Sequence, residues 1–306
     1  MKMTLETVPK ISFVIATKDR PDELCRALQS IRHQSRRPDE IIIVDGGSVS
    51  IEDVINKFLE LNIIYLKSTP PSASRQRNLG IHKVGSSIDL VGILDDDIVF
   101  ETNAIEKMVS FWEQASSNLG GAAFNLVNHP GLSLGILKRL PFSKTLELYS
   151  SEPGVVLKSG FQTMIGYLNK NQFVKWLPST ACVYRKQVFR ETCFDEWFSD
   201  YSYLEDLDIS YTVGKKYLLA VVADANYYHL PATSSRLKAM EFGKREVKNR
   251  LYFVKKNKEL SLAHCYLDLS LRLLMNLGLS VTSRRLYFAK RAWGNVLGLI
   301  ASLDAR

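Results

Sequence analysis

The sequence has few cysteines, and their spacing excludes two classes of protein. Cys25, Cys182, Cys193 and Cys265 are scattered along the chain and form no CxxC pair. A disulfide scaffold and a zinc site are therefore not expected, because both need cysteines at characteristic spacings. Reduced thiols in a cytosolic protein are the simplest interpretation.

Long apolar runs are also lacking. The nearest approach, Leu262 to Val281, is interrupted by His264, Asp268 and Arg272, so a membrane-spanning helix is not predicted. The first ten residues carry charges and no apolar run, which argues against a signal peptide. A chain of 306 residues with 46% apolar and 24% charged residues is typical of one large globular domain, with or without a small appendage.

Acidic residues are scarce near the C-terminus. Residues Arg236 to Arg306 contain 15 Lys and Arg against 5 Asp and Glu, a net charge of +10, so the first 235 residues carry −2 of the total +8. A basic tail that meets an anionic partner is one interpretation, and a solvated charged face is the other.

The first 125 residues alternate short apolar runs with segments of helical periodicity. Runs that are apolar on both faces and separated by helices indicate an α/β fold with a mainly parallel sheet covered by helices. The expected strands are 11–16, 40–45, 63–66, 90–94 and 122–127, and the expected helices are 24–31, 54–59, 75–84 and 104–115.

Periodicity is poor in residues 130–175, which are rich in Gly, Pro, Ser and Lys. A long irregular stretch of this kind is typical of a functional lid or binding segment. Further strands are expected at 180–184, 218–223 and 227–229, with a helix at 204–213. From Leu237 three helices are predicted, broken near Lys258 and Gly278. The predicted domains are 1–235, which holds the sheet, and 236–306, a helical appendage.

Three consecutive carboxylates, Asp95, Asp96 and Asp97, directly follow the strand 90–94. Adjacent carboxylates repel one another unless a cation or hydrogen-bonding ligand compensates. Mg²⁺ or Mn²⁺ would suit oxygen ligands and would bridge them to a substrate diphosphate. An acidic helix N-cap is the alternative, although a cap needs only one Asp.

Polar residues also follow the first two strands, as Thr17-Lys18-Asp19-Arg20 and Asp45-Gly46-Gly47-Ser48. In parallel sheets ligands bind beyond the carboxyl ends of the strands. Glycines allow close approach of a ligand to the backbone, and Asp45 could accept hydrogen bonds from a base or ribose. A helix-capping turn explains the same residues.

Three further groups are candidates for chemistry. Arg75 and Arg77 lie near a helix start, which favours phosphate, or they are simply solvent-exposed. Glu205 and Asp206 begin a later helix, where they serve as a general base or only complement the helix dipole. His229 could ligate a metal or contact phosphate, or be structural.

With these segments in order, the chain resembles the family 2 glycosyltransferases, which have the Rossmann-like GT-A fold. The resemblance covers roughly residues 10–255. It rests on the stretches Val14–Pro21, Ile41–Ser48, Arg77–Gly80, Leu94–Asp97 and Glu205-Asp206. Tyr228-His229 and the basic segment Lys248–Lys256 look like the bacterial rhamnosyltransferase subgroup.

The resemblance implies a role for each matching residue. Thr17, Asp19 and Asp45 would line the nucleoside pocket, and Arg75 or Arg77 would hold the base or diphosphate. Asp95 would contact ribose, sugar or metal, Asp97 would bind the metal, and Asp96 would contact the donor or replace a metal ligand. Asp206 would be the general base, with Glu205 its neighbour or substitute, and His229 would lie near the metal and diphosphate. Many relatives have an acidic residue where this chain has Gly46, which leaves the nucleotide base open.

The implied function is inverting transfer of a sugar from a nucleoside-diphosphate sugar to an acceptor hydroxyl. We expect a metal-dependent enzyme of bacterial surface polysaccharide or glycolipid synthesis, with a divalent cation as cofactor and a glycan or lipid-linked acceptor. It would lie in the cytoplasm, with its basic helices either on the anionic inner face of the plasma membrane or packed on the catalytic domain.

A nucleotidyltransferase and a non-catalytic sugar-nucleotide or glycan-binding module are the alternatives. The former would usually carry a glycine-rich loop after the first strand, which is absent, and the latter would not require a base. Nucleic acid is not an expected partner, because the tail lacks a stacked-aromatic pattern.

Overall fold

The computed structural model describes residues 8–129, 147–199, 202–231 and 238–304. The chain divides into two compact units. One lies within residues 1–130 and 165–232, and the other within 131–164 and 233–306. The domain boundary predicted between residues 235 and 236 stays a prediction. In the structure, residues 147–164 belong to the same unit as the C-terminal helices.

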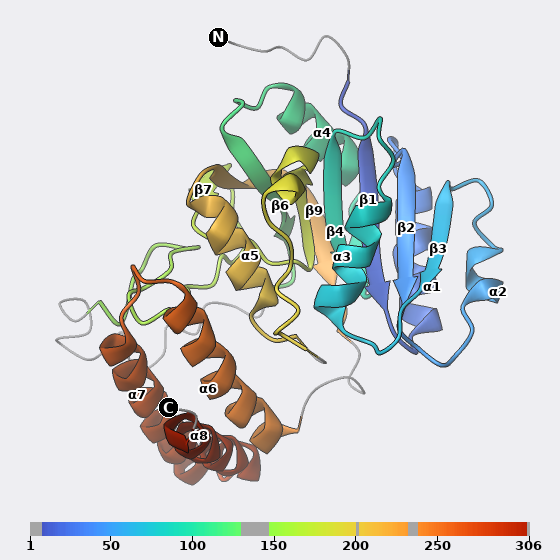
Figure 1. Ribbon diagram of the computed structural model, residues 1–306. Coiled ribbons are helices and arrows are strands. Elements are labelled where there is room, and N and C mark those ends of the chain that lie inside the picture. The colour runs from blue at the N-terminus through green and yellow to red at the C-terminus, as the bar shows by residue number, and fades with distance from the viewer. Residues whose placement is uncertain (1–7, 130–146, 200–201, 232–237, 305–306) are drawn as a thin grey trace. The chain divides into compact units, whose positions relative to one another are not determined.

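The first unit is built on a nine-stranded sheet with the order β3-β2-β1-β4-β8-β6-β9-β5, and β7 also pairs with β9 (Figure 1). The strands are β1 (Ile11–Thr17), β2 (Glu40–Asp45), β3 (Ile63–Lys67), β4 (Leu90–Asp95), β5 (Ile98–Phe100), β6 (Leu119–Leu126), β7 (Gln172–Val174), β8 (Ala181–Arg185) and β9 (Leu218–His229). Strands β1 to β4 are parallel, as expected, whereas β8, β5 and β7 run antiparallel to their neighbours.

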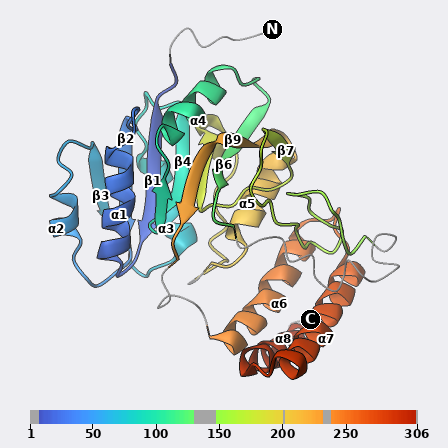
Figure 2. The same cartoon turned by 180° about the vertical axis from the view of Figure 1, so that it is seen from behind.

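Helices cover both faces of this sheet, α1 and α4 on one side and α3 and α5 on the other (Figures 1 and 2). They are α1 (Pro21–Arg32), α2 (Glu52–Ile55), α3 (Ala73–Lys83), α4 (Ala104–Glu113) and α5 (Glu205–Gly214). Helix α1 begins with Pro21, whose ring fixes a helical φ. A 3-10 turn at Lys186–Arg190 follows β8.

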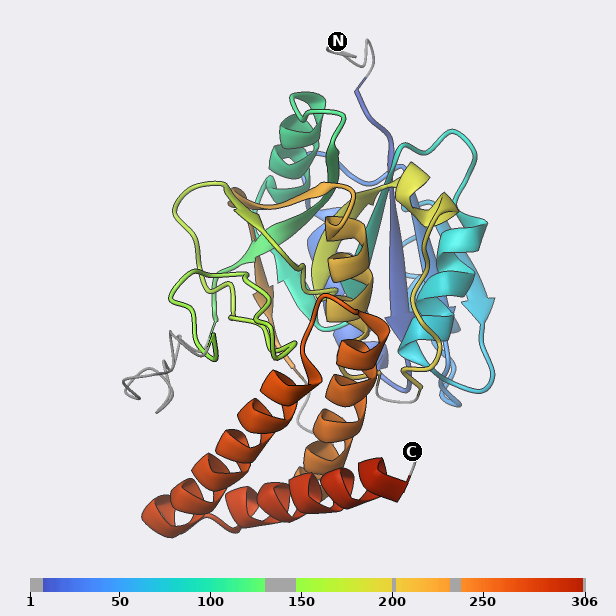
Figure 3. The same ribbon diagram turned by 60° about the vertical axis from the view of Figure 1, so that its left-hand side comes forward.

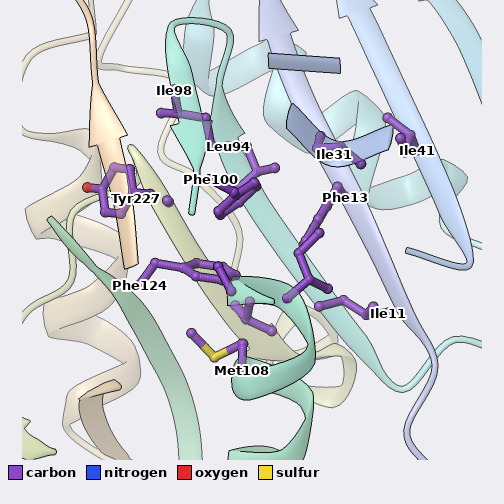
Figure 4. Packing of buried hydrophobic residues seen from close by; sticks show 14 of the residues in the cluster. Ile11, Phe13, Ile31, Ile41, Leu94, Ile98, Phe100, Met108, Phe124 and Tyr227 are labelled. Atoms are coloured by element: carbon purple, nitrogen blue, oxygen red, sulfur yellow. The ribbon is translucent and has the colours of Figure 1, made fainter. Parts of the chain in front are cut away.

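The core lies between the sheet and α1 and α4. Phe13 and Ile15 of β1 point to this side, and the rings of Phe100 and Phe124 pack at a centroid distance of 4.7 Å (Figure 4). Val14 points to the other face, where Gly80 of α3 packs so closely that a Cβ would collide with the valine. The mainly apolar run of β1 therefore reflects burial on both faces.

Three expected elements need correction. The predicted break near Gly278 is wrong, because helix α7 (Leu262–Ser283) runs through it. The two strands expected at 218–223 and 227–229 are one strand, β9, with a register shift where it pairs with β6. The helix expected at 54–59 is a single turn, Glu52–Ile55.

The second unit consists of α6 (Ala239–Lys256), α7 and α8 (Leu286–Asp304), with the irregular segment 147–164 attached. The ring of Phe161 lies between the guanidinium groups of Arg250 and Arg272, 4.1 and 3.8 Å from their Cζ atoms. Asp268 is fully buried and accepts hydrogen bonds from Ser159 and Arg272. These contacts fix residues 159–161 to α6 and α7. The lid predicted at 130–175 stays a prediction, and its residues 130–146 lie outside the described part.

No helix in the described ranges is long and apolar enough to cross a membrane.

Candidate active site

Two carboxylates and an imidazole converge where β4, β5 and β9 meet. Strand β4 ends at Asp95, and β5 pairs with β9 so that Ile98 lies opposite His229. This register brings His229 back to the acidic turn, and its Nε2 lies 3.0 Å from Asp97 Oδ1. Ligand atoms of Asp95, Asp97 and His229 all lie within 4.8 Å of one another. The three predicted metal ligands therefore form one cluster.

The charges in this cluster influence one another strongly. Burial opposes ionisation of both Asp97 and His229, but their hydrogen bond lowers the pKa of Asp97 and raises the pKa of His229. Burial raises the pKa of Asp95, and the nearby Asp97 adds to this. A site of this kind favours a cation, because a cation would compensate the repulsion between the carboxylates.

Asp96 points away from the cluster, toward the end of β1. Its carboxylate accepts hydrogen bonds from Thr17 Oγ1 at 2.7 Å and Arg20 Nη1 at 2.8 Å. Burial raises the pKa of Asp96 to about 6. Arg20 also lies 3.4 Å from Asp97 Oδ2. Thr17 is thus occupied by Asp96, and Arg20 supplies a positive charge beside two of the three aspartates.

Arg77 links the acidic turn to helix α5. Its guanidinium donates to Asp95 Oδ1 at 2.9 Å and to Glu205 Oε1 at 2.7 Å, and lies 5.3 Å from the ring centre of Phe194. The Arg77 side chain is only 5% exposed. Burial disfavours its charge, yet Glu205 and Asp95 raise its pKa. In this structure Arg77 therefore contacts carboxylates, and a contact with a nucleotide stays a prediction.

Asp206 follows Glu205 in the first turn of α5. Glu205 is buried and burial raises its pKa to about 8, although Arg77 acts in the opposite direction. Asp206 is half-buried, and its Oδ1 accepts a hydrogen bond from the Leu207 amide at 2.7 Å. The two neighbouring acidic residues therefore differ in their surroundings. Glu205 is bonded to Arg77, whereas Asp206 is the more accessible carboxylate.

Asp45 at the end of β2 is fully buried. Its Oδ2 accepts hydrogen bonds from Lys67 Nζ at 2.6 Å and Tyr65 Oη at 3.0 Å, and its Oδ1 accepts one from the Gly47 amide at 2.6 Å. Lys67 is half-exposed and also donates to the Gly47 carbonyl. The carboxylate predicted to contact a base or ribose is thus already engaged by three donors, one of which is an exposed ammonium.

Asp19 joins the first two strand ends. Its Oδ1 accepts hydrogen bonds from the amides of Ser48 and Val49, which lower its pKa. A Cβ at Gly47 would lie 2.5 Å from the Asp19 amide nitrogen. Glycine is therefore required at position 47 for the two loops to meet.

The structure also explains why position 46 is a glycine. A Cβ there would lie 2.8 Å from Gln76 Oε1 and 2.8 Å from Pro71 Cβ. The Gln76 side chain donates to the carbonyls of Thr17 and Val44, which ties α3 to the ends of β1 and β2. An acidic side chain at position 46 would displace this contact.

Arg75 lies on the surface, 42% exposed, with its Nε 3.3 Å from Glu196. Glu196 also accepts a hydrogen bond from Asn78, which fixes the segment before α5 to α3. Arg75 and Arg77 therefore face different surroundings, although only one residue separates them.

Sequence reasoning did not single out several residues of this site, namely Arg20, Lys67, Gln76, Asn78 and Glu196. Arg20 was detectable, since it lies within the polar turn after the first strand. Asn78 lies within the stretch Arg77–Gly80 that carries the family resemblance, whereas Lys67, Gln76 and Glu196 are recognised only by their contacts.

The sequence profile named Glycosyl transferase family 2 matches residues 12–192, more than half of the chain. The chain belongs to this family.

Two curated relatives support the same assignment. An uncharacterised glycosyltransferase of Bacillus subtilis, YwdF, is 37% identical over 107 residues, which cover 35% of this chain and 39% of the relative. The match thus spans about two fifths of that relative's length. The UDP-Gal:alpha-D-GlcNAc-diphosphoundecaprenol beta-1,3-galactosyltransferase of Escherichia coli is 29% identical over 199 residues, 58% of this chain and 70% of the relative.

Among solved structures, a mannosyltransferase from Pyrobaculum calidifontis in complex with GDP-Man and Mn²⁺ is similar with a TM-score of 0.58. The similarity covers 96% of this chain and 88% of the other, at 12% identity. This likeness concerns the fold. The GT-A fold class expected from the sequence is confirmed, and membership in this family supports an enzyme.

Proposed function

We propose that this chain is an inverting, metal-dependent glycosyltransferase that moves a sugar from a nucleoside-diphosphate sugar to a hydroxyl of a glycan or lipid-linked acceptor. The observation that carries the proposal is the cluster of Asp95, Asp97 and His229, joined through Arg77 to the helix that carries Asp206. Metal ligands and a base candidate are thus connected by one buried residue.

The donor atoms of the cluster fit a divalent cation. Two carboxylates and one imidazole within 4.8 Å suit Mn²⁺, which accepts oxygen and nitrogen ligands, and Mg²⁺ as well. When bound, such an ion offsets the charge that builds on a leaving diphosphate. Arg20, beside Asp96 and Asp97, would add a second positive charge at the same edge.

Asp206 is the proposed general base. It is more accessible than Glu205, whose carboxylate is held by Arg77. Asp206 would take the proton from the acceptor hydroxyl as that oxygen attacks the anomeric carbon from the face opposite the leaving group. A single displacement of this kind inverts the anomeric configuration.

Thr17, Asp19 and Asp45 would form the nucleoside side of the site, with Lys67 as an added donor at its edge. The similar proteins differ in their nucleotide sugar: the E. coli enzyme is named for UDP-Gal, and the Pyrobaculum enzyme was solved with GDP-Man. The name of the E. coli relative, which acts on a diphosphoundecaprenol-linked sugar, also supports a lipid-linked acceptor. With such an acceptor the chain would act in bacterial surface polysaccharide or glycolipid synthesis.

The first experiment measures thermal stability with UDP, GDP, dTDP and CDP, each with and without Mn²⁺. A ligand that binds the native state raises the melting temperature by mass action. We expect one nucleotide to stabilise the protein only with metal, and Asp97→Asn to abolish this gain. If no nucleotide stabilises the protein, the assignment of a nucleoside-diphosphate sugar as donor is wrong. The hypothesis of a non-catalytic binding module is then favoured.

A second experiment measures sugar transfer with the nucleotide so identified. Asp206→Asn should reduce kcat by about a hundredfold or more while the metal-dependent thermal shift remains, since a base acts in the reaction rather than in donor binding. Asp224→Asn, at an exposed position on β9, is the matched control. Inversion is tested by NMR of the anomeric proton in the first product formed.

A further inference from the structure

Helix α7 has an exposed face that carries no charge. Leu267, Leu274, Leu277 and Val281 are 41–78% exposed, and their spacing of seven, three and four residues places them on one side of the helix. A helix that faced only water would carry polar residues there. The opposite side of α7 holds the buried residues Cys265, Asp268, Leu269 and Asn276.

Helix α8 repeats this arrangement. Leu286, Trp293 and Ile300 are 73%, 57% and 51% exposed and recur every seven residues. Another side of α8 packs closely on α6, where a Cβ at Gly294 would collide with the Met240 carbonyl and one at Gly298 would lie 2.8 Å from Val247 Cβ. The exposed apolar side chains are therefore not used to hold α8 against α6.

The two exposed faces are connected by a basic turn. Figure 3 shows α7 and α8 as two long helices that follow one another at the C-terminal end of the chain. Arg284 and Arg285 join them and are exposed, as is Lys290 one turn into α8. Residues 269–303 contain five Lys and Arg and no Asp or Glu. Two of the five, Arg272 and Arg291, form ion pairs with the buried Asp268 and Glu246. The exposed Arg284, Arg285 and Lys290 would attract an anionic surface, and no carboxylate in this stretch would repel it.

We propose that the α7–α8 face, defined by Leu274, Val281, Leu286 and Trp293, docks on an anionic lipid surface. The apolar side chains enter the boundary between headgroups and acyl chains, and Arg284, Arg285 and Lys290 contact the lipid phosphates. A half-exposed Trp among aliphatic side chains and beside basic residues is typical of the membrane interface.

The positive charge of the α7–α8 face favours a lipid surface over a second copy of this chain as its partner. In a two-fold symmetric pairing the same patch occurs on both partners. Arg284 and Arg285 would then approach their own copies, and residues 269–303 offer no carboxylate to compensate. A lipid phosphate supplies the missing negative charge.

The test uses the full chain and co-sedimentation with vesicles of phosphatidylcholine alone or with roughly 30% phosphatidylglycerol. We expect binding to the mixed vesicles at least about tenfold stronger than to the neutral ones, and weaker at high salt. Val281→Asp combined with Leu286→Asp should reduce this binding by about tenfold or more. Leu59→Asp, 83% exposed in the first unit, is the matched control and should bind as the wild type does.

Fluorescence gives a second readout that is independent of catalysis. Brominated acyl chains should quench the emission of Trp293, and Trp293→Phe should remove most of that quenching, because Trp112 and Trp176 are buried and Trp197, which is 37% exposed, lies in the first unit and not on α7 or α8. The melting temperatures of the variants verify that they fold. Equal vesicle binding by the double variant and the wild type would overturn the proposal. So would a dimer in sedimentation equilibrium that the double variant abolishes, because the face would then be a protein interface.

Discussion

Arg77 and Glu205 are joined by a buried hydrogen bond of 2.7 Å, although 128 positions separate them in the sequence. The pair joins α3, which packs on the ends of β1 and β2, to the first turn of α5. Since Arg77 also holds Asp95, the geometry of the acidic turn and of the base-carrying helix depends on one guanidinium group.

We expect Arg77→Met to lower the free energy of unfolding by about 3–5 kcal/mol, because it leaves the buried carboxyl group of Glu205 and the partly exposed carboxylate of Asp95 without their partner. Arg77→Lys should lose less, since a positive charge remains. Arg75→Met is the control: its pair with Glu196 is more than two fifths exposed on both sides, so a loss below about 1 kcal/mol is expected. Urea unfolding measures all three, and equal losses for Arg75→Met and Arg77→Met would contradict the role of Arg77.

The pKa of Glu205 should make stability depend on pH. Burial raises it from 4.5 to about 8, so the folded state holds a proton that the unfolded state has released between these values. This contribution is fully present below about pH 4.5 and is lost as the pH rises through 8. As the pH rises from about 4.5 to 8, the free energy of unfolding of the wild type should therefore fall relative to that of Glu205→Gln, by up to about 1.4 kcal/mol per pH unit. Groups that titrate in both proteins cancel in the difference, and parallel curves from pH 5 to 8 would show that Glu205 is ionised throughout.

The metal proposal predicts unequal effects for two histidines. His229→Ala should weaken Mn²⁺ binding by about tenfold or more, as one of three protein ligands is lost. His82→Ala, at an exposed position on α3, should leave it unchanged. The Mn²⁺ concentration that gives half of the nucleotide-dependent thermal shift measures this. A similar midpoint for His229→Ala and wild type would remove His229 from the ligand set.

Two glycines should respond to alanine in opposite directions. Gly47→Ala brings a Cβ against the Asp19 backbone and should cost about 1–3 kcal/mol. A Cβ at Gly278 meets nothing within 4 Å inside α7, so Gly278→Ala should stabilise by roughly 0.5–1 kcal/mol through helix propensity. Denaturant unfolding tests both, and destabilisation by Gly278→Ala would argue against a continuous α7.

Much of the first unit could be predicted from local pattern. The strands that hold Ile11–Ala16 and Leu90–Leu94 were predicted from short, mainly apolar runs, because burial on both faces favours apolar side chains at successive positions. The helix break predicted near Gly278 is absent from the structure. A glycine costs only about 1 kcal/mol in a helix, and the helix packing of this unit outweighs that cost.

The sequence by itself determined the α/β class, the family and which residue types gather at the strand ends, because these follow from periodicity and from short contiguous motifs. Only the tertiary structure decided the partners. Asp96 turned to Thr17 and Arg20, Asp45 was engaged by Tyr65 and Lys67, and His229 reached Asp97 through the β5–β9 pairing. The physical reason is that hydrogen bonds and ion pairs act over about 3 Å in space, whereas these partners lie 20 to more than 100 residues apart along the chain.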